Sequence, residues 1–195
     1  SRLTNDREKI MKIFSAISRL ADTANGKLSG RHLNFQTYIQ RRYFNMILHE
    51  ANKRLYTMSN NQFILKCRDM EDLSGQGEVG LDLDVYSLVN DQVRDVKTLS
   101  GGESFMAALS MALGMSDIIQ NNAGSIHIDT MFIDEGFGSL SDDTRMQAIK
   151  ILNELSGGKR LVGIISHVTE LKAQIGTKLV VTKGEKGSRA KWDIS

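Results

Sequence analysis

The stretch from residue 98 to residue 138 constrains the fold of this chain more than any other. Residues 98–103 read Thr-Leu-Ser-Gly-Gly-Glu, an apolar helical pattern follows, and residues 130–138 read Thr-Met-Phe-Ile-Asp-Glu-Gly-Phe-Gly. The first part predicts a glycine turn that opens a helix, and the last predicts a short buried strand that ends in two carboxylates. A second apolar strand is predicted at 161–165. The two strands should therefore pair in parallel through a right-handed crossover.

The glycine turn has the features of an anion site. Ser100 and Glu103 have the S-x-x-E spacing of a capping box, in which each side chain satisfies a backbone N–H group of the first turn. Gly101 and Gly102 between them leave the backbone uncovered. A helix start with bare N–H groups and a positive dipole end can bind phosphate. The same box also opens many helices that bind no ligand.

Two carboxylates and one histidine are candidates for chemistry. Asp134 and Glu135 end a strand on which consecutive side chains point to opposite faces, so we expect them to have different roles. One can hold a hard cation while the other orients a water molecule. An exposed turn is the alternative for these acids. His167 follows the second strand, where a single histidine is usually structural.

Composition narrows the class of protein without identifying a partner. The chain has 195 residues, of which 41% are hydrophobic, and a formal net charge of +2. It can bury a core as one domain or lobe, and its charge argues neither for nor against nucleic acid. The single cysteine, Cys67, excludes an internal disulfide framework and fits a reducing cytosol. The chain starts inside a helical pattern without Met, so we interpret it as a piece of a longer protein.

Two long helices are predicted in the first 58 residues. Residues 3–24 have apolar side chains at alternating steps of four and three, which fits a coiled-coil seam or an ordinary amphipathic helix. Residues 25–33 should form a break and a connector. Residues 35–58 carry a similar apolar stripe. Four basic residues lie mostly off that stripe and would form the wet face of the helix or, alternatively, contact DNA: Arg41, Arg42, Lys53 and Arg54.

The remaining segments predict strands, a helix and turns. Strands at 63–68 and 79–86 should form a hairpin or meander, with Asp82 and Asp84 on a solvent-facing side. Residues 90–97 are expected to be a polar approach to the glycine turn, and Ser141 to cap a helix that ends near 155. Strands at 178–183 and 190–194 should form a terminal hairpin. A second Leu-Ser-Gly-Gly at 155–158 follows a helix instead of opening one, which favours a structural role.

Together and in this order, these motifs resemble those of the ABC-type ATPases. Residues 98–103 correspond to the signature motif, 130–135 to the Walker B motif and His167 to the switch histidine. The form Phe-Ile-Asp-Glu-Gly-Phe-Gly at 132–138 is similar to the DNA-repair branch of that superfamily, the SbcC family. The resemblance implies an α/β fold, the C-terminal lobe of an ATPase head with a mixed sheet and flanking helices. It implies the end of a coiled-coil helix at 1–26 and the lobe itself at 27–195.

The resemblance also implies roles for the site residues. Asp134 would hold Mg²⁺, Glu135 would be the general base, and His167 would contact the γ-phosphate. The ATP bound to a second head would contact the turn of this head that comprises Leu99, Ser100, Gly101, Gly102 and Glu103. A loop across the dimer would comprise Ser139, Leu140, Ser141 and Asp142. The family usually has aspartate where Ser141 stands, so its contact could pass to Ser141 or Asp142, or be absent.

One partner follows from what the sequence lacks. No phosphate-cradling G-x-x-x-x-G-K-[ST] loop occurs, and in the SbcC family that Walker A loop lies in an N-terminal half, which we therefore expect as a partner. The resemblance further implies three partners: a second copy of the head (a homodimer on ATP binding), an SbcD-like nuclease and double-stranded DNA. The expected cofactors are ATP and Mg²⁺, with ATPase activity absent from the isolated chain.

The resemblance implies a cytoplasmic, nucleoid-associated location. No membrane contact is expected, because the sequence has neither a membrane-spanning apolar run nor a signal peptide. Two alternatives remain open. The chain could be an SMC- or RecN-type lobe of another DNA-associated ATPase. It could also be a non-catalytic docking module.

Overall fold

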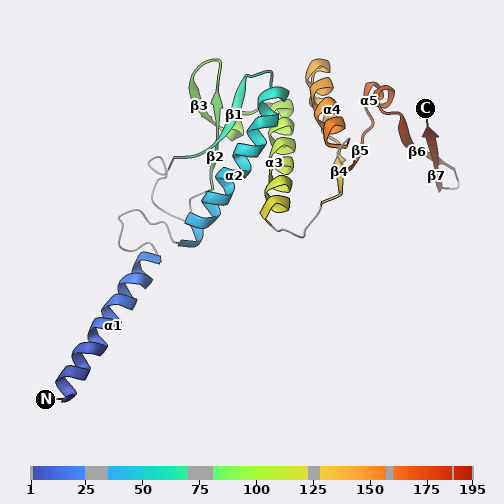
Figure 1. Ribbon diagram of the computed structural model, residues 1–195. Helices are drawn as coiled ribbons and strands as arrows, with labels where there is room; N and C mark the ends of the chain where they lie inside the picture. The colour runs from blue at the N-terminus through green and yellow to red at the C-terminus, as the bar shows by residue number, and fades with distance from the viewer. Residues whose placement is uncertain are drawn as a thin grey trace. The chain divides into compact units, whose positions relative to one another are not determined.

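The computed structural model describes residues 2–24, 35–69, 81–122, 128–156, 160–185 and 187–194 (Figure 1). The chain divides into two compact units. The first comprises Ser1–Leu99 and Ala107–Ile126, and the second comprises Ser100–Met106 and His127–Ser195. Helix α3 (Gly101–Asn122) contributes its first turns to the second unit and the rest to the first. The predicted boundary between coiled coil and head, at residue 26, lies outside the described residues.

The two long helices form as predicted. Helix α1 spans Arg2–Ala24, and its side chains at Ile10, Phe14 and Ile17 are exposed. Helix α2 spans Phe35–Met58. Only the second half of its predicted apolar stripe is buried, while Phe35 and Tyr43 are exposed. The coiled-coil interpretation of α1 stays a prediction.

A three-stranded antiparallel sheet forms the centre of the first unit. Its strands are β1 (Phe63–Cys67), β2 (Leu83–Ser87) and β3 (Gln92–Asp95), adjacent in that order. Pairing places Leu65 opposite Val85 and Val85 opposite Arg94. Alternation along β1 buries every second side chain. The predicted antiparallel pairing of the first two strands is confirmed, but β2 begins at Leu83 instead of near residue 79. The turn expected at 75–77 lies outside the described residues. Strand β3 forms within the segment expected to be a polar approach.

Helix α2 packs on this sheet and on α3, which lies beside it (Figure 1). The Asn52 side chain on α2 donates to Leu65 O and accepts from Leu65 N, both at 2.8 Å, so it occupies the hydrogen-bonding edge of β1. A Cβ at Gly114 on α3 would lie 2.7 Å from Ile47 O and Ala51 N. The core around these contacts contains Leu48, Ala51, Leu55, Met58, Phe63, Leu65, Val85, Leu109 and Leu113.

The second unit contains the predicted parallel pair. Strand β4 (Thr130–Asp134) lies beside β5 (Leu161–Ile165), with Thr130 opposite Leu161. Helix α4 (Asp142–Ser156) connects them, and its Ile149, Ile151 and Leu152 are buried. Met146 was predicted on that buried side and is instead 59% exposed. A short helix, α5 (Thr169–Gln174), leads to a hairpin of β6 (Thr177–Gly184) and β7 (Gly187–Ile194), as predicted.

The strands of the second unit are largely exposed. On β4 only Ile133 is buried, and Phe132 is 70% exposed, which corrects the prediction of a buried strand. Leu161 and Ile165 on β5 are also exposed. On the hairpin, the pairs Leu179–Trp192 and Val181–Ala190 share one face, and all four side chains are exposed. Strands of a parallel sheet normally have both faces buried, so the apolar surface on β4 and β5 is unusually exposed.

None of the described helices is long and apolar enough to cross a membrane.

Candidate functional site

The predicted capping box forms at the start of α3. Ser100 N donates to Glu103 Oε2 at 2.8 Å, and Glu103 N donates to Ser100 Oγ at 3.3 Å. The two side chains therefore satisfy each other's backbone N–H groups, which fixes the point where the helix begins. Ser100 and Gly101 are exposed. The first-turn N–H groups face outward along the helix axis, where the helix itself supplies no acceptor.

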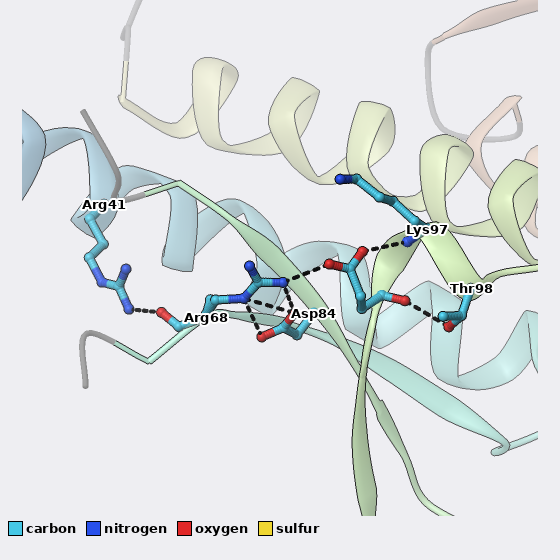
Figure 2. Close-up of polar contacts among 6 residues, drawn as sticks. Arg41, Arg68, Asp84, Lys97 and Thr98 are labelled. Atoms are coloured by element: carbon cyan, nitrogen blue, oxygen red, sulfur yellow. Dashed lines mark hydrogen bonds and ion pairs between the residues drawn. The ribbon is translucent and has the colours of Figure 1, made fainter. Parts of the chain in front are cut away.

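The segment before this turn is held by an arginine cluster (Figure 2). Arg68, just after β1, donates to Asp84 on β2, with its shortest contact at 2.6 Å, and to Asp95 at the end of β3 at 3.0 Å. Arg41 on α2 donates to the Arg68 carbonyl. Asp95 then accepts from Lys97 N at 2.8 Å, and its carbonyl accepts from Thr98 Oγ1 at 2.7 Å. These contacts fix a 3-10 turn, η1 (Val96–Thr98), directly before the signature motif.

The cluster corrects one sequence prediction and shifts two pKa values. Asp84 is 7% exposed, so it does not lie on the solvent-facing side that alternation along β2 predicted. Hydrogen bonds to Asp84 and then to Asp95 raise the pKa of Arg68 above its usual range. The N–H of Lys97 and the guanidinium of Arg68 lower the pKa of Asp95.

Strand β4 ends at Asp134, and the backbone then reverses. Glu135 has φ 59° and Gly136 has φ 94°, both in the left-handed region. Glu135 N nevertheless donates to Ile165 O at 2.9 Å, so the turn remains anchored to β5. Since Glu135 lies outside the strand, its direction is set by this turn instead of by the strand alternation that the sequence argument used. A positive φ at a residue other than glycine is strained, and such strain concentrates at functional sites.

His167 faces Glu135 across the ends of the two parallel strands. Its Nδ1 lies 3.1 Å from Glu135 Oε1 and 2.9 Å from Oε2. The His167 side chain is 80% exposed and that of Glu135 51%. A ring that carries its proton on Nδ1 donates to the carboxylate and orients it. The arrangement places an exposed carboxylate, fixed by a histidine, at the carboxyl end of a parallel strand pair, where ligands of open α/β sheets bind.

The loop after β4 contacts the signature turn within the second unit. A Cβ at Gly102 would lie 2.8 Å from Ser139 O and 3.7 Å from the Leu140 side chain. The Phe105 ring of α3 packs edge-on against Phe137, with centroids 5.0 Å apart. The loop contains a 3-10 turn, η2 (Phe137–Ser139), in which Ser139 Oγ donates to Gly136 O at 2.8 Å. The second signature glycine is therefore required because the loop backbone occupies the space of a side chain.

Ser141 and Asp142, the two alternatives for the contact across the dimer, are held differently. Ser141 Oγ caps α4, as predicted, by accepting from Thr144 N at 3.4 Å, and it also bonds Thr144 Oγ1. The Asp142 side chain accepts from Arg145 at 2.9 Å and is 87% exposed. Ser141 is thus used by its own helix, while Asp142 presents a carboxylate to the outside.

Asp134 fits a magnesium ion by its chemistry. Its carboxylate is at the exposed end of β4, and Mg²⁺ is usually bound by one or two carboxylates together with water and phosphate oxygens. Across the described residues, no group of three or more His, Cys, Asp or Glu could hold a metal ion.

Comparison with known proteins identifies the family. Residues 81–162 match the family described as SbcC/RAD50-like, Walker B motif. The chain is 46% identical over 175 residues to the SbcC subunit of the nuclease SbcCD of Vibrio cholerae, and 40% identical over 188 residues to the protein of the same name from Lactococcus lactis. These matches cover 90% and 93% of this chain. Residues 81–162 of the chain thus belong to the SbcC/RAD50-like family. It spans 17% of the length of each of these two relatives.

The chain shares its fold with solved structures of SMC ATPases. One of them, described for the ATP-driven dimerization and DNA-stimulated activation of SMC ATPases, matches with a TM-score of 0.61 at 15% identity. The match covers 80% of this chain and 88% of that one. At this identity the likeness establishes the fold alone. The α/β head-lobe fold inferred from the sequence is confirmed, and a Walker B domain is found within residues 81–162.

Two arginines of this SbcC-family lobe were missed by sequence reasoning. Arg68 binds carboxylates 16 and 27 residues away, and Arg145 is buried beneath the loop after β4. No short motif marks either position. A basic residue in the first turn of α4 is nevertheless unusual, because the helix dipole disfavours a cation there, and this could have drawn attention to Arg145.

The basic residues of α2, for which DNA contact was the alternative, are mostly occupied within the chain. Arg54 pairs with Asp117 at 2.7 Å and Lys53 with Glu50 at 2.7 Å, while Arg41 donates to Arg68 O. The contacts of Arg54 and Arg41 favour structural roles for these two side chains, while Lys53 is in an exposed surface pair that contributes little to stability.

Proposed function

We propose that this chain is the C-terminal lobe of an SbcC-like ATPase. With its N-terminal half it would bind and hydrolyse ATP in a head-to-head dimer, and so control an SbcD-like nuclease that processes DNA double-strand breaks and hairpins. The observation that carries the proposal is the Glu135–His167 contact beside Asp134. It stands in the same unit as the capped glycine turn of the signature motif.

Glu135 is proposed as the general base. Its carboxylate would accept a proton from the attacking water while His167 Nδ1 holds its orientation, and His167 would also contact the γ-phosphate. Transfer of a phosphoryl group depends mostly on positioning and charge stabilisation, and the rigid turn at Glu135 and Gly136 provides such positioning. Asp134 would hold Mg²⁺, which supplies charge neutralisation at the phosphate oxygens.

The signature turn is proposed to meet the nucleotide of the second head. Leu99, Ser100, Gly101, Gly102 and Glu103 form or border an exposed helix start whose amide groups favour an anion. The adjoining loop of Ser139, Leu140, Ser141 and Asp142 would contact that head directly. Of the two alternatives we favour Asp142 for the charged contact, because its carboxylate is exposed while Ser141 caps α4.

The N-terminal half is the proposed cover for the open strands. Phe132, Leu161 and Ile165 expose apolar side chains on β4 and β5, and strands of a parallel sheet are normally buried on both faces. The apolar face of the β6–β7 hairpin would be covered in the same way. Double-stranded DNA and the nuclease are proposed as partners of the assembled protein, on the strength of the relatives' name and the SMC-type fold.

The test uses full-length protein with both halves and its nuclease. Addition of ATP should produce head dimers and turnover, measured by light scattering and phosphate release. Ser100→Arg should abolish both, since a long cation at the helix start opposes the amide dipoles and blocks the turn. Glu135→Gln should keep ATP binding and dimerisation while turnover falls by about 10²–10⁴-fold, the usual contribution of a general base.

Either of two results would refute the proposal. Normal turnover by Glu135→Gln would remove the assigned base. A wild-type protein that neither dimerises nor hydrolyses ATP would support a docking module instead.

A further inference from the structure

Arg145 is a buried cation without an assigned role. It lies in the first turn of α4, is 8% exposed as a residue, and its side chain is 10% exposed. A positive charge near a helix N-terminus is disfavoured by the dipole, and a buried guanidinium needs partners for its donors. Neither helix formation nor core packing explains an arginine at this position. Its hydrogen bonds do.

All three nitrogens of the guanidinium donate to the loop after β4. Nε donates to Phe137 O at 3.3 Å, and Nη2 donates to Leu140 O at 3.1 Å. Nη1 donates to Asp142 Oδ1 at 2.9 Å. The two carbonyls belong to the 3-10 turn η2 and to the residue after it. The planar fork of arginine thus ties the two ends of a short turn to the start of α4, a task that a single ammonium cannot perform.

The opposite side of the same loop faces the signature turn. Ser139, between the two bound carbonyls in sequence, approaches Gly102 so closely that a Cβ there would lie 2.8 Å from its oxygen. Phe105 covers Gly136 and packs on Phe137. The loop is therefore held between α3 and the Arg145 side chain, and a shift of its backbone would move Ser139 relative to the signature glycines.

We propose that Arg145 is a positioning residue for the loop of Ser139–Asp142 and, through Ser139, for the signature turn. It holds the backbone from beneath and keeps the Asp142 carboxylate at the exposed surface. The inference rests on the proposed function, because it assumes that this loop and turn meet the second head. Arg145 touches no reacting atom in this assignment.

The test compares substitutions on α4 in the full-length protein. Arg145→Lys keeps the charge and the stem but loses the fork, and Arg145→Met removes the donors. Lys150→Met is the matched control for loss of a cation, because Lys150 is exposed on the same helix. Ile151→Val is the control for a small loss of packing, because Ile151 is buried there. For each variant the kcat and KM for ATP, the Kd of ATP-dependent head dimerisation and the unfolding midpoint are measured.

Arg145→Lys should lower kcat and weaken dimerisation by about 10-fold each, with KM for ATP within about two-fold of wild type, since misplacement of a positioning element acts on the assembled state. Arg145→Met should lower kcat and dimerisation affinity further than Arg145→Lys does. Both control variants should keep the wild-type kcat. Hydrogen exchange should show faster exchange at 137–141 in Arg145→Lys. If Arg145→Met does not fold, the result for Arg145→Lys alone tests the proposed role of Arg145.

Two outcomes overturn the inference while leaving the proposed function intact. In one, Arg145→Lys has wild-type kcat and dimerisation, although Ser100→Arg still abolishes both. In the other, Ile151→Val loses as much kcat as Arg145→Lys at an equal drop in unfolding midpoint, which makes the effect one of general stability. Failure of the proposed function itself is recognised separately, by a wild-type protein without ATP-dependent dimerisation.

Discussion

Helix α3 has two glycines in close contact with other segments, and the two contacts differ in their surroundings. Just past the middle of the helix, Gly114 faces the backbone of α2 at Ile47 and Ala51, within a buried core. At the N-terminal end, Gly102 faces Ser139 O on an exposed loop. The same missing side chain therefore permits helix packing at one position and the approach of two motif segments at the other. Close approach alone does not distinguish a structural glycine from a functional one; the exposure of its neighbours does.

The largest effect that separates the two positions is expected from Gly102→Ala. The added Cβ must displace Ser139 or the start of α3, and a misplacement of about 1 Å in an assembled site costs roughly 100-fold in rate. We expect kcat for ATP to fall by about that factor in full-length protein, while thermal unfolding changes little. Steady-state phosphate release and calorimetry on the same preparation measure both. Wild-type kcat for this variant would show that the contact with Ser139 is not needed.

Gly114→Ala should have the opposite profile. The new Cβ would be 2.7 Å from main-chain atoms that no rotamer change can move. Overpacking costs about 1–3 kcal/mol, from which a gain of about 1 kcal/mol in helix propensity is subtracted. We expect a net loss of up to about 2 kcal/mol in the free energy of local opening of α2 and α3, measured by hydrogen exchange, with kcat unchanged. A larger loss of kcat than of stability would contradict the contrast.

Loss of the cap at the N-terminal end of α3 is expected to have a smaller effect on stability. Ser100→Ala removes the oxygen that accepts from Glu103 N, and loss of such a cap costs about 1 kcal/mol. Amides of the first turn of α3 should exchange faster, while those near Gly114 keep wild-type protection. Ser104→Ala, an exposed change one turn later, is the matched control and should leave first-turn exchange unaltered. Equal effects of the two variants would show that the capping box contributes nothing.

The smallest effect concerns pH and the segment before α3. The pKa of Asp95 is lowered by Lys97 N–H and Arg68, so its ionised form is favoured in the folded state. Its stabilisation is present above the ordinary pKa of about 4 and is lost as the pH falls through the lower folded value. Asp95→Asn should therefore flatten the decline in unfolding midpoint below about pH 4. Wild type and variant declining in parallel would show that Asp95 has no such linkage.

Local patterns predicted the fold where neighbours in sequence are neighbours in space. The S-x-x-E spacing predicted the start of α3, and the periodicity of residues 35–58 predicted α2 with the bounds that the structure has. The parallel pair followed from two apolar runs separated by a helix. Each of these depends on contacts within about one helical turn or on a general rule of chain connection.

Contacts between distant residues could not be predicted in the same way. Asp84 looked like a solvated residue because β2 alternates, but its carboxylate pairs with Arg68, just after β1, and this ion pair makes its burial favourable. The exposure of Met146 and Phe132 depends on which segments pack against α4 and β4. The hydrophobic periodicity of the sequence does not identify those segments. At the site, residue types indicated Asp134, Glu135 and His167, but the left-handed turn at Glu135 and the support from Arg145 required coordinates.

The bidentate contact of Asn52 with Leu65 has a consequence for solubility. An outer strand with unpaired amides is a template on which other chains can add, and here one side-chain amide occupies both main-chain groups at the middle of β1. An incoming strand is thus blocked at this position by a side chain of α2, the helix that packs on the sheet. Replacement of Asn52 by leucine would leave the packing of α2 largely apolar yet reopen β1 as a seed for intermolecular cross-strand pairing.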